Sequence, residues 1–425
     1  MSEFSTVSGQ TQDGSAKVVY GLPFWVLIGY FFVEYVRPQD RIPGIGALKI
    51  GLLLSVLSAL IWFSKGDKTV LREPLVRLYI AFVLLAAATV PLAVNTFWAY
   101  RSTEAMALFF LAATLPATTV LAEPAKLFRF FPYWIVFHVL ITLSSIKTAG
   151  RGSGGFLSDE NDFALAVVMA IPYAYFLSQS PRIKFRGKLL YLTAAGILAF
   201  GVIVTASRGG FVGLVGCLGM ILLLAKHKLR NLLMVCLLGL GVWVFVPSSY
   251  YGEIESINDP TDSTRQDRLY MWDRAMEMYA DHPTIGVGAG NYPWRVYEYQ
   301  LKTPDFDPAS TRQRGGRVAH SLYFTLIAEL GTLGTLFYVG MLWVVVRKLF
   351  RVMKAKSDNP AVQLELTDYS LLAKAMLVSL GTYLLSGAFI SVLYYPHLSY
   401  LIGFVIALSY CTAKATQSPS APAVT

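Results

Sequence analysis

Residues 317–331 read RVAHSLYFTLIAELG, an arginine and a histidine followed by an almost wholly apolar run. The apolar run continues to about residue 346, which is long enough to cross a hydrocarbon core of about 30 Å as a helix. Polar side chains therefore stand where a membrane-spanning helix is expected to begin. The rest of the sequence supplies the setting for them.

Windows of this kind recur along the whole chain. Its 425 residues are 55% hydrophobic and only 15% charged, whereas soluble domains carry roughly 25% charged residues. The mean hydropathy is +0.52. A soluble fold could not bury the amount of apolar surface that this value implies. We predict an all-α polytopic membrane protein with about twelve spans. They are 18–36, 46–63, 75–94, 103–122, 130–147, 161–178, 188–206, 209–225, 231–247, 319–346, 368–393 and 396–414.

The basic residues predict how these spans are oriented. The net charge of +10 comes mostly from short gaps between apolar windows, and the gaps on one side are richer in Lys and Arg. In a soluble protein such a charge would suggest nucleic-acid binding. Here the distribution of Lys and Arg follows the positive-inside rule of membrane proteins. It predicts a cytoplasmic tail at 1–17, spans one to nine within 18–247, an outer loop at 248–318, spans ten to twelve within 319–414, and a disordered cytoplasmic tail at 415–425. No cleavage site follows the first apolar stretch, so we expect its helix to be retained.

The sequence contains no strong pattern for a metal site or for disulfide bonds. Cys217, Cys236 and Cys411 all lie inside apolar windows without CxxC spacing. The stretch DFD at 305–307 has the DxD form that can hold a divalent metal, but two acidic residues flanked by prolines in an acidic loop more often form a solvated turn. We predict no metal site and no cofactor.

The outer loop contains a predicted helix. STRQDRLYMWDRAMEMYA, residues 263–280, has apolar residues at helical intervals and capping-box spacing between Ser263 and Gln266. Arg265, Arg268 and Trp272 would share one face of this helix. DHP at 281–283 should end it, because the residue before a proline avoids the helical conformation. IGVGAGNY follows, with glycines at 286, 288 and 290, but it lacks the strands of a dinucleotide-binding motif.

Several arginines lie on the predicted outer face, against the positive-inside bias. Arg208 occupies the short gap TASRGG, Arg151 precedes span six, and Arg317 precedes span ten. Each alone could reach out to lipid phosphates. The alternative is that Arg208 and Arg268 bind the phosphates of an anionic lipid-linked substrate, because guanidinium groups match phosphate oxygens in bidentate fashion. Further candidates in support are Arg265, Arg312, Arg314 and Arg317.

His320 is the candidate general base. It lies in the first turn of a predicted span, on the face that carries Arg208, where a neutral imidazole could take a proton from a hydroxyl group. We interpret the other four histidines as structural. They are His138, His227, His282 and His397.

Two acidic regions complete the set of candidates. Glu329 lies about 13 Å further along the helix from His320, where a carboxylate needs a buried partner such as Lys374 or a water-lined cavity. We expect it to support the structure. Asp159, Asn161 and Asp162, at the start of span six, could cap that helix or bind sugar hydroxyls.

Together these stretches carry a resemblance to a known family. The motifs in question are NDFALA (161–166), TASRGG (205–210), RLYMW around Arg268 and Trp272, DHPTIGVGAGNY (281–292) and AHSLYFTLIAELGTLG (319–334). Their order and spacing resemble the O-antigen ligase and O-antigen polymerase superfamily. VEYVRPQDRIP at 33–43 is similar to a branch of O-glycosylation ligases.

The resemblance implies a GT-C-like glycosyltransferase of the bacterial inner membrane with its active site facing the periplasm. A ligase of this kind moves O-antigen from undecaprenyl diphosphate to the lipid A core without a metal. By motif, Arg208 and Arg268 would bind the diphosphate, and His320 would be the base. Ser321 stands where many relatives have Asn, so the role of that position is open.

Three alternatives stay open from the sequence. Two belong to the same superfamily, namely an O-antigen polymerase and a protein O-oligosaccharyltransferase. The third is a secondary transporter, which twelve spans would also suit. The chain lacks the similar halves expected of a transporter, and its polar residues gather at the outer mouth.

Overall fold

We analysed a computed structural model of the chain. It describes residues 20–417, except for 149, 153, 227, 230–231, 234–262, 305, 308 and 310–314. Every secondary-structure element among these residues is a helix, so the all-α prediction is confirmed for the described chain.

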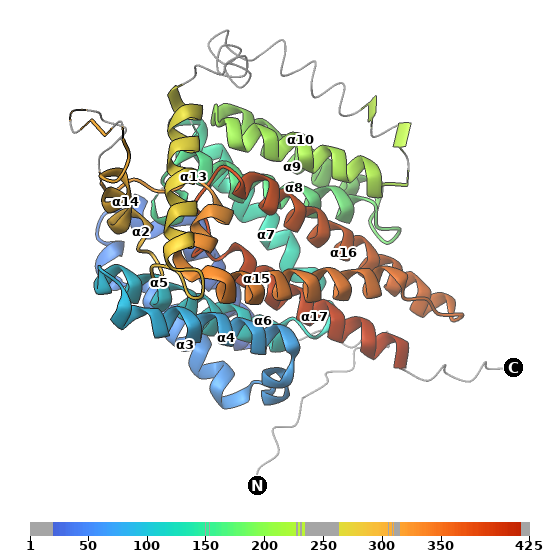
Figure 1. Cartoon of the computed structure of the whole chain (residues 1–425). Coiled ribbons are helices and arrows are strands. Elements are labelled where there is room, and N and C mark those ends of the chain that lie inside the picture. Colours follow the sequence, from blue (N-terminus) through green and yellow to red (C-terminus); the bar gives the residue numbers. More distant parts are fainter. Residues whose placement is uncertain are drawn as a thin grey trace, which may run out of the picture.

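The main helices follow one another along the chain and form a bundle (Figure 1). Their bounds are α1 Leu22–Val36, α3 Ile50–Lys65, α4 Pro74–Thr89, α5 Thr96–Phe109, α6 Leu115–Val120, α7 Pro124–Ser145, α8 Glu160–Ser178, α9 Phe185–Val204, α10 Arg208–Leu224, α13 Ser263–Asp281, α14 Tyr292–Gln300, α15 Leu322–Lys354, α16 Pro360–Gly387 and α17 His397–Gln417. A π-helical turn at Phe110–Thr114 joins α5 to α6.

The described helices agree with a multi-pass membrane protein. Within the described residues, nine helical segments are long and apolar enough to cross a membrane, and α1 and α10 are shorter apolar helices. Each of these lies at a predicted span. The remaining predicted span, 231–247, falls outside the described residues except for Leu232 and Leu233, as does most of both predicted tails.

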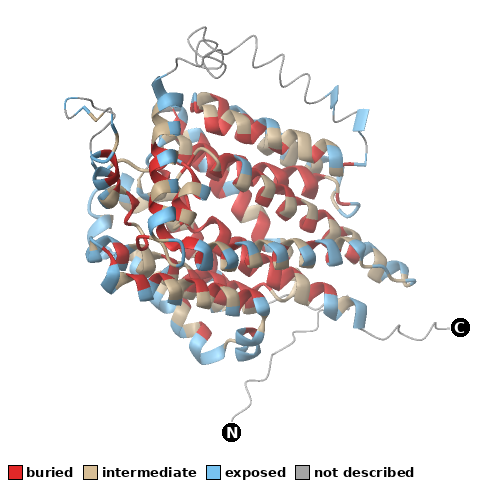
Figure 2. Cartoon of the chain, in the orientation of Figure 1, coloured by how far each residue is buried: buried red, intermediate tan, exposed pale blue. Residues whose placement is uncertain are grey.

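Burial separates the interior helices from the lipid-facing ones. α8 is buried over almost its whole length, from Asp162 to Ser178, and contacts α7, α9, α10 and α16. Alanines at 164, 166, 170 and 174 let these neighbours approach closely. α3, by contrast, presents exposed leucines and a phenylalanine along its length. Figure 2 shows this contrast between the red interior and the paler periphery.

Two helices of the outer loop lie across one end of the bundle (Figure 1). α13 confirms the helix predicted at 264–280, and it ends at Asp281 immediately before His282 and Pro283. The helix already includes Ser263, so this residue is not its cap. α14 was not predicted.

The long helix α15 is interrupted where the sequence predicts a continuous span. Gly331 has φ 59° and ψ −157°, which breaks the helical hydrogen-bond ladder. The segment after α13 supplies hydrogen-bond partners for the backbone groups at this break. The N–H groups of Thr332 and Leu333 donate to the carbonyls of Pro283 and Thr284, at 2.8 and 3.1 Å. The two segments therefore form one interlocked unit.

Replacing Gly331 by alanine should open this unit. A Cβ atom there would lie 2.6–2.7 Å from backbone atoms of Thr284, Ile285 and Gly286, at a φ that alanine avoids. We expect Gly331→Ala to lower the free energy of unfolding by at least about 2 kcal/mol, measured as thermal unfolding in neutral detergent.

Gly340 of the same helix supplies the control. Its Cβ would meet only Leu78 side-chain atoms at 3.6–3.7 Å, an ordinary contact. Gly340→Ala should therefore be neutral or stabilise the helix by up to about 1 kcal/mol. Equal behaviour of the two variants would contradict the role given to Gly331.

Candidate functional site

Three arginines predicted to act together line one cavity of about 310 Å³. Arg208 comes from the start of α10, whereas Arg265 and Arg268 come from α13. Trp272 and Phe389 contribute apolar walls. The prediction that Arg265, Arg268 and Trp272 share one helix face agrees with this lining. A cavity with several guanidinium groups and aromatic walls suits an anion attached to an apolar or sugar moiety.

The position of Arg208 depends on the turn before α10. Ser207 caps this helix: its hydroxyl oxygen accepts a hydrogen bond from the Gly210 N–H at 2.9 Å. The same hydroxyl donates to Oδ1 of Asn161 at 2.6 Å. Asp159 in turn holds Asn161 by accepting from its backbone N–H and from Nδ2, at 2.8 and 2.9 Å. Asn161 therefore connects the start of α8 to the helix end that carries Arg208.

The other two candidates near α8 do not line the arginine cavity. Asp162 is buried and accepts a hydrogen bond from the Tyr395 hydroxyl at 2.8 Å, which ties α8 to the segment before α17. Arg151 is exposed and pairs with Glu160 at 3.2 Å. Asp162 and Arg151 therefore make contacts within the protein and do not face the arginine cavity.

His320 lies next to α13, in a strained turn before α15. Its φ is 48°, in the left-handed region that non-glycine residues rarely adopt, and its side chain reaches the surface. The preceding carbonyl, that of Ala319, accepts a hydrogen bond from Nε1 of Trp272 at 2.9 Å. The atoms packed around the ring, and then the positive charges of Arg268 and Arg317, lower the pKa of His320. A neutral imidazole is therefore favoured beside the arginines.

Stacking and an ion pair fix α13 over the start of α15. The ring of Trp272 stacks on Phe324, with centroids 4.8 Å apart and planes 14° apart. Arg317 pairs with Asp267 of α13 at 2.9 Å, which gives this arginine a contact within the protein. Arg268 lies over the ring of Phe389 at 5.6 Å.

Glu329 holds the glycine-rich loop that follows α13. Its carboxylate accepts hydrogen bonds from the backbone N–H groups of Gly290 and Tyr292, at 2.7 and 2.8 Å. The Tyr394 hydroxyl donates to the same carboxylate at 2.5 Å. These three donors, rather than Lys374, are the partners of this buried carboxylate.

The remaining candidates lie partly outside the described residues. Arg312, Arg314 and Asp305 fall there. Asp307 of the DFD stretch accepts a hydrogen bond from the N–H of Ala309 at 2.9 Å, as in a turn. Among the described residues, no group of three His, Cys, Asp or Glu side chains could hold a metal ion.

Sequence reasoning did not single out several residues that build the site. Ser207, Phe389, Tyr394 and Tyr395 were not candidates, although the two tyrosines stand before a proline between the last two predicted spans. Asn291 was also missed. It is fully buried and exchanges hydrogen bonds with the backbone of Asn95, at 2.8 and 3.2 Å.

Replacing Glu329 by glutamine should loosen the loop. One carboxylate oxygen would become an NH2 group that faces a backbone N–H or a hydroxyl hydrogen. We expect Glu329→Gln to destabilise the protein by about 1–3 kcal/mol and to increase protease cleavage between residues 286 and 292.

The matched control is Glu298→Gln on α14. Glu298 forms an exposed pair with Arg295 at 2.8 Å, and such pairs contribute at most about 1 kcal/mol. Equal effects of the two substitutions would show that the hydrogen bonds of Glu329 are not important for the loop.

Comparison with known proteins agrees with this geometry. A family model described as O-antigen ligase matches residues 193–339. This stretch includes Arg208, Arg268 and His320, which the structure brings to one end of the bundle. No curated protein matches the chain. Residues 193–339, about a third of the chain, are therefore similar to the O-antigen ligase family.

Proposed function

We propose that the protein is an O-antigen ligase, an inverting glycosyltransferase that works without a metal. It would transfer O-antigen polysaccharide from undecaprenyl diphosphate to a sugar hydroxyl of the lipid A core. The observation that carries the proposal is the convergence of Arg208, Arg265 and Arg268 on one cavity, with His320 directly after the Ala319 carbonyl that Trp272 of the cavity wall binds.

The arginines would bind the diphosphate of the donor. When the bond between the anomeric carbon and the phosphate oxygen breaks, negative charge grows on the departing diphosphate. Fixed guanidinium groups stabilise that charge without having to reorganise. Arg208 is held at a capped helix end and Arg268 lies on the neighbouring helix, so two rigid elements present their charges to the cavity.

His320 would act on the acceptor. A neutral imidazole takes the proton of the acceptor hydroxyl as its oxygen bonds to the anomeric carbon from the face opposite the diphosphate, and this geometry inverts the configuration. The lowered pKa of His320 favours the neutral imidazole that this role needs. α13 would cover the reacting groups and limit the access of water, which competes as an acceptor.

The same proposal places the protein in the bacterial inner membrane with both termini in the cytoplasm. The excess of Lys and Arg in alternate short gaps supports this orientation. The arginine cavity would then face the periplasm, where lipid-linked donor and lipid A core meet. Membrane lipids surround the bundle, and nucleic acid has no place in this function.

Removing the imidazole of His320 tests both its role as the base and the assignment of the protein as a ligase. We expect His320→Ala to insert and fold but to lose at least about 100-fold in transfer rate. Cells with this variant should lack lipopolysaccharide with attached O-antigen and accumulate long lipid-linked polymer. The measurement is electrophoresis of lipopolysaccharide together with extraction of the lipid-linked fraction.

His282→Ala is the control, since His282 follows the end of α13 and lines a different cavity, together with Arg295. Normal O-antigen banding from a well-expressed His320→Ala variant would refute the proposal that His320 is the general base. Core bearing at most one repeat unit would identify a polymerase instead, and glycan transfer to protein would identify the second superfamily alternative.

Arg208→Lys separates bidentate binding from simple attraction. Lysine keeps the charge but not the planar pair of donors. We expect at least about tenfold lower kcat/KM with purified enzyme and lipid-linked donor, which corresponds to about 1.4 kcal/mol. Arg151→Lys, on an exposed pair beside the cavity, should leave the rate unchanged. Full activity of Arg208→Lys would show that surface attraction suffices.

A further inference from the structure

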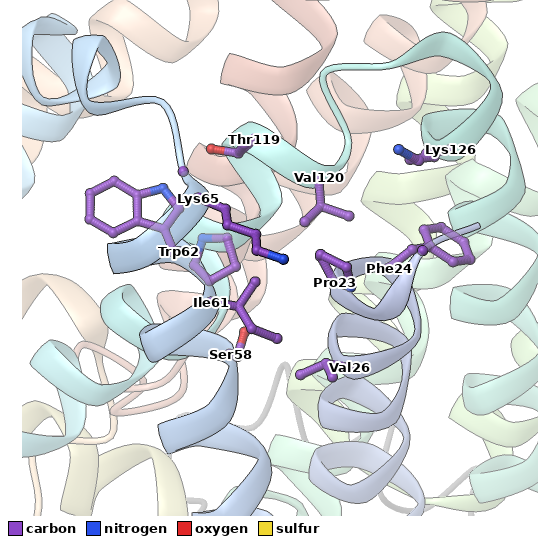
Figure 3. Close-up of a pocket in the computed structure, with 13 residues that line it drawn as sticks. Pro23, Phe24, Val26, Ser58, Ile61, Trp62, Lys65, Thr119, Val120 and Lys126 are labelled. Carbon is purple, nitrogen blue, oxygen red and sulfur yellow. The ribbon is translucent and has the colours of Figure 1, made fainter. Parts of the chain in front are cut away.

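A second cavity lies between helices that take no part in the arginine site. It has a volume of about 160 Å³ and is enclosed by the start of α1, the ends of α3 and α6, and the start of α7 (Figure 3). Its walls are mainly apolar. The lining side chains include Pro23, Phe24, Val26, Ile61 and Val120.

This cavity lies at the opposite end of the bundle from His320. α15 begins beside His320 and, 26 residues after Leu322, its Lys348 pairs with Glu73 at 2.8 Å. α15 is broken at Gly331, but its part from Gly331 to Lys348 alone covers roughly 25 Å at 1.5 Å per residue. Glu73 follows closely after the end of α3 at Lys65. The cavity is therefore at the far membrane boundary, which the predicted orientation assigns to the cytoplasmic leaflet.

One lysine of the lining has no ion-pair partner among the described residues. Figure 3 shows the Lys65 side chain extending from α3 toward Pro23 of α1. Within the described residues, Lys65 forms no ion pair. The other lysine of the lining, Lys126, pairs with Glu123 at 2.5 Å. Lys65 is an exposed residue, so its ammonium group offers a positive charge at the surface of the cavity, which attracts an anion.

Two further donors of the lining are unused. Nε1 of Trp62 has no hydrogen-bond partner among the described residues, although this side chain is only 3% exposed. The indole ring is held in place by Nζ of Lys68, 3.9 Å from its centroid. The buried hydroxyl of Thr119 likewise has no partner among the described residues. Buried polar groups normally find partners, so these two point to a ligand with acceptor oxygens.

The start of α1 adds a partial positive charge. This helix begins at Leu22, next to the cavity, and no side chain caps it. Pro23 has no N–H group and the N–H of Phe24 donates to the Gly21 carbonyl at 3.0 Å, so the contribution of this helix end is its dipole, which favours anions. The ammonium, indole and hydroxyl groups are all donors, and phosphate oxygens would accept from all three.

We propose that this cavity binds the phosphate headgroup of an anionic membrane lipid. The lipid source follows from the outer surface of α3, where Leu53, Val56, Leu60 and Phe63 are exposed and would contact hydrocarbon. A headgroup bound at Lys65 could lay its acyl chains along this face. Basic pockets between helices at the cytoplasmic boundary bind such headgroups in other membrane proteins.

The test uses the purified full-length protein in neutral detergent. Dioctanoyl phosphatidylglycerol is titrated and bound copies are counted by native mass spectrometry, with dioctanoyl phosphatidylcholine and inorganic phosphate as comparison probes. We expect one tightly bound phosphatidylglycerol. Lys65→Gln should weaken its binding about tenfold, the equivalent of about 1.4 kcal/mol, and the isosteric Thr119→Val should weaken it about threefold.

The matched control is Lys356→Gln, an exposed lysine just after the far end of α15. This variant should bind phosphatidylglycerol as the parent does. Unchanged binding by Lys65→Gln or Thr119→Val would overturn the proposal, as would equal binding of the phosphatidylcholine probe. If inorganic phosphate competed as strongly as the lipid, the ligand would be a free anion and the lipid assignment would fail.

Discussion

A backbone group inside a membrane has no water to bind, so a helix can be broken there only if other protein groups replace the lost hydrogen bonds. α15 is broken in this way at Gly331. The carbonyls of Ala328 and Glu329 accept from the N–H groups of Val287 and Gly288, at 2.9 and 3.0 Å. Two N–H groups beyond the break donate back to the incoming segment. The glycine-rich loop is thus part of the helix's own hydrogen bonding.

That exchange determines where the outer helices lie. The loop comes directly after α13 and leads into α14, so fixing it to α15 fixes the end of one helix and the start of the other. Trp272 then ties α13 to the carbonyl just before His320. On the other side of the cavity, Asn161 and Ser207 fix the start of α10. Hydrogen bonds, ring stacking and one ion pair therefore hold the three segments that carry Arg208, Arg268 and His320.

Hydropathy and helical periodicity were sufficient to predict α13 and the helices at eleven of the twelve expected spans, because both depend on which residues are apolar and how they are spaced. They could not reveal the break in α15. Gly331 stands inside a continuous apolar run, and its conformation depends on backbone groups about 45 residues away in the chain. The partners of Glu329 were missed for the same reason, since two of them are backbone N–H groups that no residue type identifies.

The sequence also left open whether the outer arginines serve lipid headgroups or a substrate, and in the structure these arginines differ in their contacts. Arg151 and Arg317 have carboxylate partners within the chain, Glu160 and Asp267. Arg208, Arg265 and Arg268 instead line a cavity, and Arg268 lies over an aromatic ring. An arginine that only reaches for lipid needs neither a cavity nor a capped helix end to hold it. Arginines that must meet a diphosphate at a fixed distance from a base need both, because electrostatic stabilisation of a transition state depends on charges that are in place before the bond breaks.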